Sequence, residues 1–147
     1  TDLLTRYKLA DSLCVYMEQS AYSMFEQQVY SLRDDALTKE NIMELYRQVG
    51  TDFGFDAFDW DPREIVTVIH FFTAPMYTVS YVVSNDLALQ FYQLEQEDPG
   101  AGLALYEQIL PSQESYILTF ARDCGLESPF SEERLAAVAT LFQKTSF

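Results

Sequence analysis

The chain has 147 residues, of which 48% are hydrophobic and 15% aromatic, so it can bury a core and is not expected to be disordered. Nine basic and 23 acidic side chains give a net charge of −14. This charge argues against binding to nucleic acids and to anionic membrane surfaces, because both are negatively charged themselves.

The first fifty residues carry the spacing of two helices. Apolar side chains recur on one helical face over residues 3–32, and the charged residues 33–35 break this pattern. A second helix is expected to begin after Thr38, whose hydroxyl is a suitable N-cap. It is expected to end at Gly50, because glycine is common at helix C-termini.

An aromatic loop and a clearly marked helix start follow. Residues 51–61 are rich in aspartate and aromatic side chains, whose spacing predicts a loop anchored by its rings. Asp61 can cap a third helix, and Pro62 suits its first position. We expect this helix to end near Phe72, because a proline follows shortly after it.

The rest of the chain also has helical periodicity, and no segment shows convincing strand alternation. Four more helices are expected, over residues 75–96, from the turn at 98–100 to residue 110, over 111–125, and from 128 onward. The predicted fold class is therefore all-α, a helical bundle of six or seven helices. Residues 1–147 are expected to form a single all-α region.

The N-terminal residues, the absence of long apolar runs and the cysteines indicate where the protein is located in the cell. No apolar run reaches the roughly 20 residues that span a bilayer, and the first residues lack a signal-peptide pattern. The sequence begins with Thr1 rather than Met, so we expect a chain cut from a longer one. Cys14 and Cys124 are far apart and are expected to be buried free thiols, with a disulfide as the alternative. Together these features favour a cytoplasmic protein.

Residue counts limit the chemistry of this chain. A zinc site needs three or four His, Cys, Asp or Glu ligands, whereas the chain has one histidine and two isolated cysteines. No metal site is therefore expected within it. A Ser-His-Asp triad would have to use His70, but no G-x-S-x-G motif accompanies it. No glycine-rich phosphate loop is present.

One stretch, residues 69–81, combines side chains that suit a functional site. His70 lies at a predicted helix end, and Tyr77 and Tyr81 follow four residues apart on one helix face. Histidine and tyrosine can donate hydrogen bonds that stabilise negative charge on an oxygen. The alternative is a helix corner with a hydrogen-bonded core histidine and two packed tyrosines, and the pattern by itself favours that alternative.

Several short motifs follow one another along the chain. They are Met24-Phe25-Glu26, Leu37-Thr38 with Leu45-Tyr46, His70-Phe71-Phe72, residues 75–84 (PMYTVSYVVS), and residues 118–130. In this order they resemble the C-terminal catalytic region of the oligoendopeptidase F group, relatives of thimet oligopeptidase. The resemblance implies a zinc metallopeptidase with a largely helical, clamshell-like fold, of which this chain is the C-terminal part.

The resemblance also implies roles for individual residues. His70 and Tyr77 match positions that bind substrate and stabilise the tetrahedral oxyanion, and Tyr81 matches a tyrosine that lines the cleft. The zinc ligands and the general-base glutamate would lie in an H-E-x-x-H helix upstream of Thr1. Departures from the family pattern are Phe72 in place of tyrosine, Val79 in place of an aromatic residue, and Ser84 in place of glycine.

The sequence thus predicts part of a zinc-dependent oligopeptidase that hydrolyses short peptides. The expected partners are a peptide substrate and the N-terminal remainder of the same protein, with zinc bound by residues outside this chain. Alone, the chain is expected to be inactive. Two alternatives stay open, a non-catalytic helical interaction module and a catalytically degenerate metallopeptidase-like protein.

Overall fold

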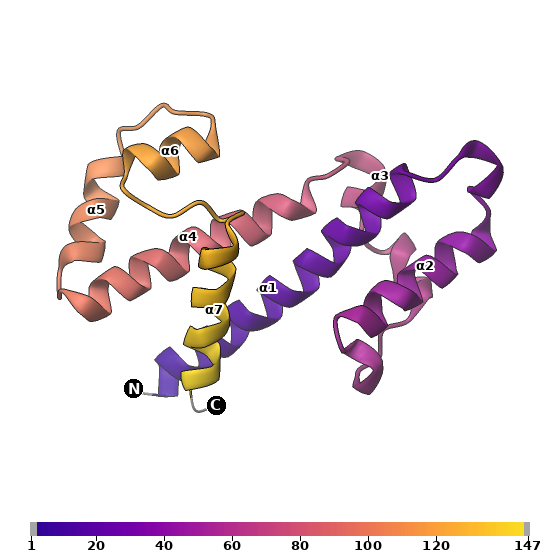
Figure 1. The fold of residues 1–147 in the computed structure, drawn as a ribbon, viewed down its shortest axis with the longest axis horizontal. Coiled ribbons are helices and arrows are strands. Elements are labelled where there is room, and N and C mark those ends of the chain that lie inside the picture. Colours follow the sequence, from indigo (N-terminus) through magenta and orange to yellow (C-terminus); the bar gives the residue numbers. More distant parts are fainter. Residues whose placement is uncertain (1–2, 146–147) are drawn as a thin grey trace. The chain divides into compact units, whose positions relative to one another are not determined.

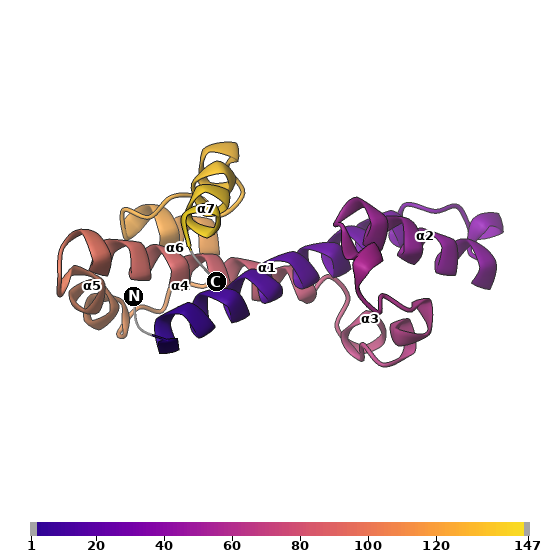
Figure 2. The same cartoon turned by 90° about the horizontal axis from the view of Figure 1, so that it is seen from below.

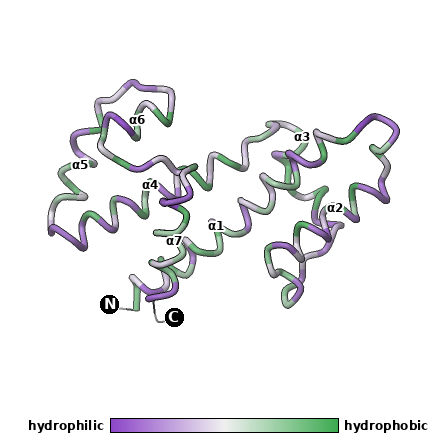
Figure 3. Tube along the Cα trace, in the orientation of Figure 1, coloured by the Kyte–Doolittle hydropathy of each residue, from purple (hydrophilic) through white to green (hydrophobic). Residues whose placement is uncertain are grey.

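The computed structural model describes residues 3–145, which form seven α-helices and three short 3-10 helices and contain no β-strand (Figure 1). The predicted all-α fold class is confirmed. None of the helices in this range is both long enough and apolar enough to cross a membrane. Hydrophobic and hydrophilic residues are interspersed along the two longest helices (Figure 3).

The chain divides into two compact units. The central unit is Cys14–Val82, and the terminal unit combines the described residues up to Leu13 with those from Val83 onward. Helices α1 (Leu3–Tyr30) and α4 (Thr78–Glu97) contribute residues to both units. The other elements are α2 (Lys39–Asp52), α3 (His70–Thr73) and the 3-10 helices η1 (Asp34–Ala36), η2 (Phe55–Ala57) and η3 (Pro62–Val66) in the central unit, and α5 (Ala101–Ile109), α6 (Ile117–Asp123) and α7 (Glu132–Lys144) in the terminal unit.

Two predicted helix starts are confirmed by their caps. Thr38 accepts a hydrogen bond from Asn41 N at 3.2 Å at the start of α2, and Asp61 Oδ1 accepts one from Arg63 N at 2.8 Å at the start of η3. Caps depend on residues two or three positions apart, so a sequence pattern is enough to locate them. The first helix ends at Tyr30, slightly before the predicted end at residue 32.

The prediction that Gly50 ends the second helix is wrong. Helix α2 continues to Asp52, and the glycine with left-handed backbone is Gly54, at φ 75°. Gly50 lies inside the helix beneath the ring of Trp60, with which an added Cβ would overlap. A glycine is therefore needed at position 50 for the close approach of a ring, not for termination.

The predicted third helix is broken into η3 and α3. The β-branched run from Ile65 to Ile69 has low helix propensity, and the Thr67 hydroxyl donates to the Glu64 carbonyl at 2.7 Å, a bond that competes with regular helix. The fourth helix begins at Thr78 rather than at residue 75. Two further helices also begin later than predicted. Helix α6 begins at Ile117 rather than at residue 111, and α7 begins at Glu132 rather than at residue 128.

The core of the central unit is built from stacked rings. Tyr46 and Val49 are fully buried, and Trp60 stacks on Tyr46 with ring centroids 4.6 Å apart. Trp60 Nε1 donates to the Tyr46 carbonyl at 2.9 Å. Phe55 stacks on Trp60 at 4.7 Å, so the prediction that rings anchor this loop is confirmed, although Phe58 in the same loop is exposed.

These buried rings predict a loss of stability in alkali. Burial, reinforced by the nearby Glu18 carboxylate, raises the pKa of Tyr22 to about 12, and burial also raises the pKa of Tyr46. Since an unfolded tyrosine titrates near pH 10, the neutral phenols stabilise the fold fully below about pH 10. That stabilisation is lost as the pH rises from about 10 to 12. Urea titrations followed by Trp60 fluorescence should show a falling midpoint over this range.

A phenylalanine variant separates this effect from general alkaline unfolding. Tyr22→Phe should make the midpoint fall less steeply above pH 10, whereas Tyr106→Phe, at an exposed ring, should follow the wild type. If the urea midpoints of the wild type and Tyr22→Phe fall equally steeply above pH 10, the buried Tyr22 phenol is not a cause of the alkaline loss of stability.

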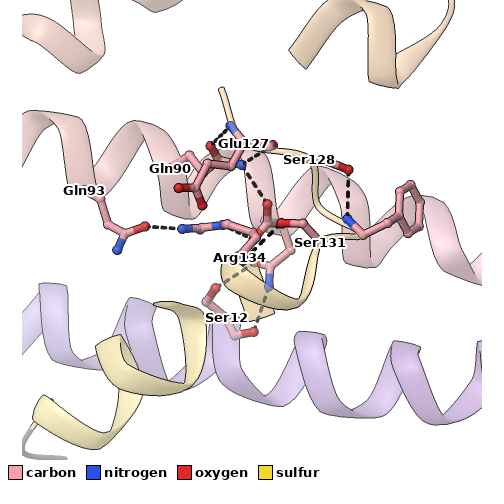
Figure 4. A network of polar contacts seen from close by, with 10 residues as sticks. Ser12, Gln90, Gln93, Glu127, Ser128, Ser131 and Arg134 are labelled. Atoms are coloured by element: carbon pink, nitrogen blue, oxygen red, sulfur yellow. Dashed lines mark hydrogen bonds and ion pairs between the residues drawn. The ribbon is translucent and has the colours of Figure 1, made fainter. Parts of the chain in front are cut away.

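A buried polar network connects α4 to α7 and to the backbone of Glu127 within the terminal unit (Figure 4). Arg134 on α7 donates to Asp86 Oδ1 at 2.8 Å and to Gln93 Oε1 at 2.6 Å, both on α4. Gln90 donates to Asp86 Oδ2 and exchanges two hydrogen bonds with the backbone of Glu127. Helix α7 accordingly lies against α4 in both ribbon views (Figures 1 and 2).

The cysteines match their prediction in part. Cys14 and Cys124 are free thiols, as expected. The expectation that both are buried is wrong, because Cys14 is exposed and Cys124 is half-buried. Cys14 occupies the solvent side of α1, a position that its apolar neighbours in sequence do not reveal.

Candidate functional site

The structure brings the three candidate residues of the sequence together. The rings of His70 and Tyr77 stack with centroids 5.0 Å apart and an interplanar angle of 12°. Tyr81 meets both rings edge-on, at 5.7 Å from His70 and 5.4 Å from Tyr77. We call this group of His70, Tyr77 and Tyr81 the ring triad.

Three consecutive elements supply the triad. His70 is the first residue of α3, Tyr77 lies in the turn that follows this helix, and Tyr81 lies in the first turn of α4. The four-residue spacing places the two tyrosines on one side of the chain. The short helix and turn fold back far enough to lay the imidazole on the Tyr77 ring.

The triad lies at the surface of the central unit. Tyr77 is 47% exposed and Tyr81 is 39% exposed, while His70 is half-buried. The alternative interpretation, a helix corner with a hydrogen-bonded core histidine and two packed tyrosines, agrees with these ring contacts but not with the surface position of the three side chains. The ring edges and hydroxyls are therefore within reach of a molecule in solution.

Hydrogen bonding within the triad is weak. The Tyr81 hydroxyl lies 3.5 Å from His70 Nε2, at the long limit of a hydrogen bond, and the donor depends on the imidazole tautomer. Within residues 3–145 the Tyr77 hydroxyl has no hydrogen-bond partner. The triad thus presents donors that another molecule's oxygen can use.

The turn between α3 and α4 has an unusual backbone. Met76 has φ 62°, the sole positive φ among the non-glycine residues that the structure describes. Left-handed backbone costs an L-residue about 1–2 kcal/mol, so other contacts must hold it. Ala74 N donates to the His70 carbonyl at 3.0 Å, and Tyr77 N donates to the Ala74 carbonyl at 3.1 Å. These bonds close the turn that carries Tyr77.

A buried glutamate completes the support of this turn. Glu26 on α1 is 2% exposed, and its Oε1 accepts from Met76 N at 2.9 Å. Its Oε2 accepts from the Thr78 hydroxyl at 2.7 Å, and Ser23 Oγ lies 3.0 Å from the same hydroxyl oxygen. We did not predict this role from the sequence, although a carboxylate four residues after the apolar Tyr22 falls on the buried helix face and is a usable signal.

The described residues hold no group that resembles a metal site. Between residues 3 and 145, no three His, Cys, Asp or Glu side chains lie together in the way that a metal ion requires. His70 contacts two tyrosine rings and belongs to no such group within the described residues.

No protein-family model, curated protein or solved structure matches this chain. The motif resemblance to oligoendopeptidases stays a prediction.

Proposed function

We propose that this chain is the C-terminal part of a zinc-dependent oligopeptidase similar to the oligoendopeptidase F group. In this proposal, His70 and Tyr77 donate hydrogen bonds to the carbonyl oxygen of the scissile peptide bond, and Tyr81 lines the cleft beside them. The zinc ion and the general base would come from residues outside this chain. The clamshell-like domain and the cytoplasmic location belong to the same proposal.

The observation that carries the proposal is the exposed ring triad. Peptide hydrolysis passes through a tetrahedral intermediate whose oxygen gains negative charge, and donors held ready for that charge lower the barrier. The Tyr77 hydroxyl is exposed and lacks a partner within residues 3–145, and stacking on His70 restricts its ring. Donors whose orientation is set before substrate arrives suit this task.

The test uses the longer protein that this chain would belong to. His70→Ala and Tyr77→Phe are each expected to lower the turnover of a quenched fluorescent peptide by on the order of 10²–10³-fold, as removal of an oxyanion donor does. Tyr77→Phe is the sharper variant, because it keeps the ring and removes only the hydroxyl. Tyr106→Phe removes a hydroxyl from another exposed tyrosine and should leave turnover unchanged.

Three results would count against the proposal. Unchanged hydrolysis in His70→Ala and Tyr77→Phe would rule out their proposed roles. The absence of an H-E-x-x-H motif upstream in the parent gene would contradict an active peptidase. One tightly bound zinc per isolated chain, measured by elemental analysis, would contradict the assignment of the zinc ligands to other residues.

A second candidate function is a non-catalytic interaction module. The segment leading into the triad exposes three large apolar side chains, with Val66 at 76%, Ile69 at 62% and Phe72 at 64% exposed. Apolar side chains gathered in one exposed segment are typical of surfaces that bind a partner. This alternative is favoured if the parent protein is inert towards peptides, self-associates in analytical ultracentrifugation, and loses that self-association in the variant Ile69→Glu.

A further inference from the structure

The turn that carries Tyr77 is held on both sides by one side chain. Glu26 accepts a long hydrogen bond of 3.4 Å from the Tyr30 hydroxyl on its own helix, and its two shorter bonds come from Met76 and Thr78, the residues immediately before and after Tyr77. The carboxylate therefore fixes the backbone of Tyr77 from two directions, while the tyrosine ring itself extends to the surface. We propose that Glu26 is a positioning residue, whose carboxylate holds Tyr77 in its stack on His70.

The chemistry of a carboxylate suits this task. A carboxylate has two acceptor oxygens, and the groups that face those of Glu26 are all donors: the Met76 backbone N–H, the Thr78 hydroxyl and, at 3.4 Å, the Tyr30 hydroxyl. A glutamine would turn an N–H₂ group towards one of these donors. No lysine, arginine or histidine within residues 3–145 forms an ion pair with Glu26. A buried charge without a counter-ion is costly, so its hydrogen bonds are its main compensation.

The strained residue Met76 connects the carboxylate to the geometry of the triad. Its left-handed backbone reverses the chain between α3 and α4, and this reversal lets Tyr77 return over His70. Loss of the bond from Met76 N to Glu26 removes support from a conformation that a non-glycine residue disfavours. The turn is then expected to relax, and the Tyr77 ring to leave the imidazole.

The single histidine allows a direct test that does not depend on activity. His70 is the only histidine in the sequence, so its imidazole proton resonances are unambiguous in an NMR spectrum. In the wild type, we expect the ring current of the stacked Tyr77 to shift these resonances upfield. Tyr77→Leu removes the ring and calibrates that displacement. Each variant is titrated so that neutral imidazoles are compared.

Glu26→Gln is expected to lose most of the upfield displacement. Adding Met76→Gly to this variant should restore part of it, because glycine adopts positive φ without strain. Thr78→Ser keeps the hydroxyl and should retain the upfield displacement. Thr78→Val removes the hydroxyl and should lose part of the displacement. If Glu26→Gln does not fold, the comparison of Thr78→Val with Thr78→Ser decides. Wild-type resonances in Glu26→Gln, or in Thr78→Val, overturn the proposal.

The catalytic consequence rests on the proposed function and has its own readout. In the parent protein, Glu26→Gln is expected to lower kcat/KM for a quenched peptide on the order of 10²-fold, as a small misplacement of a catalytic group does. If the parent is inert while the NMR displacement is lost, the proposed function is wrong and the positioning role stands. If the parent is active and the displacement is unchanged, the positioning role is wrong and the proposed function stands.

Discussion

Arg134→Ala is expected to lower the free energy of unfolding by about 3–5 kcal/mol, as loss of one partner of a buried ion pair does. Arg134 is 3% exposed, and its partner Asp86 is fully buried. Without the guanidinium, the Asp86 carboxylate keeps only the hydrogen bond from Gln90 among the side-chain contacts described for it. Urea unfolding followed by circular dichroism measures the loss.

Two further variants show whether the buried charge causes this loss. Arg122→Ala breaks an ion pair with Asp123 in which both side chains are more than half exposed, so it should cost at most about 1 kcal/mol. The double variant Asp86→Asn/Arg134→Met should be more stable than Arg134→Ala, because it leaves no unpaired charge buried. A double variant no more stable than Arg134→Ala would attribute the loss to packing instead.

Trp60→Ala is expected to be similarly damaging, with a loss of about 3–5 kcal/mol on removal of a large core ring. Trp60 stacks on two rings, covers Gly50, and donates to the Tyr46 carbonyl. Its removal leaves a cavity beside fully buried residues, and the surrounding helix cannot close it without bending. Since Trp60 is the only tryptophan, unfolding must be followed by far-UV circular dichroism.

Controls for Trp60→Ala come from the same loop and the same helix. Phe58→Ala truncates an exposed ring and should change stability by no more than about 0.5 kcal/mol. Gly50→Ala should cost about 1–3 kcal/mol in the wild type by overpacking, and clearly less when combined with Trp60→Ala. Simple additivity of these two substitutions would contradict the contact between Gly50 and Trp60.

The local parts of this fold are predictable from sequence. Helical periodicity predicts a chain of helices without strands, and Thr38 and Asp61 are recognisable as caps because their partners lie two or three residues away. The ring triad is also partly predictable. The spacing of Tyr77 and Tyr81 places both on one face, and His70 precedes Tyr77 by about two helical turns.

Pattern reasoning fails where a local preference meets a distant contact. Gly50 looks like a helix end, but Trp60 requires a glycine there to approach the helix. Residues 62–72 have a good helix start, but their β-branched run favours a break. The exposure of the triad cannot be predicted either, because an aromatic stretch next to a proline suits a core corner and a surface site equally.

Contacts within about four residues are thus sufficient to determine the helical class of this protein, its confirmed caps, and the placement of Tyr77 and Tyr81 on one side of the chain. Tertiary structure alone decides the rest, because the relevant partners are far apart in the chain. Glu26 and Met76 are separated by 50 residues, and Asp86 and Arg134 by 48. The hydrophobic periodicity of a sequence does not indicate which distant residues pair. Such a pairing arises only when a buried polar group must find a partner during packing, and here that need orients Tyr77 against His70.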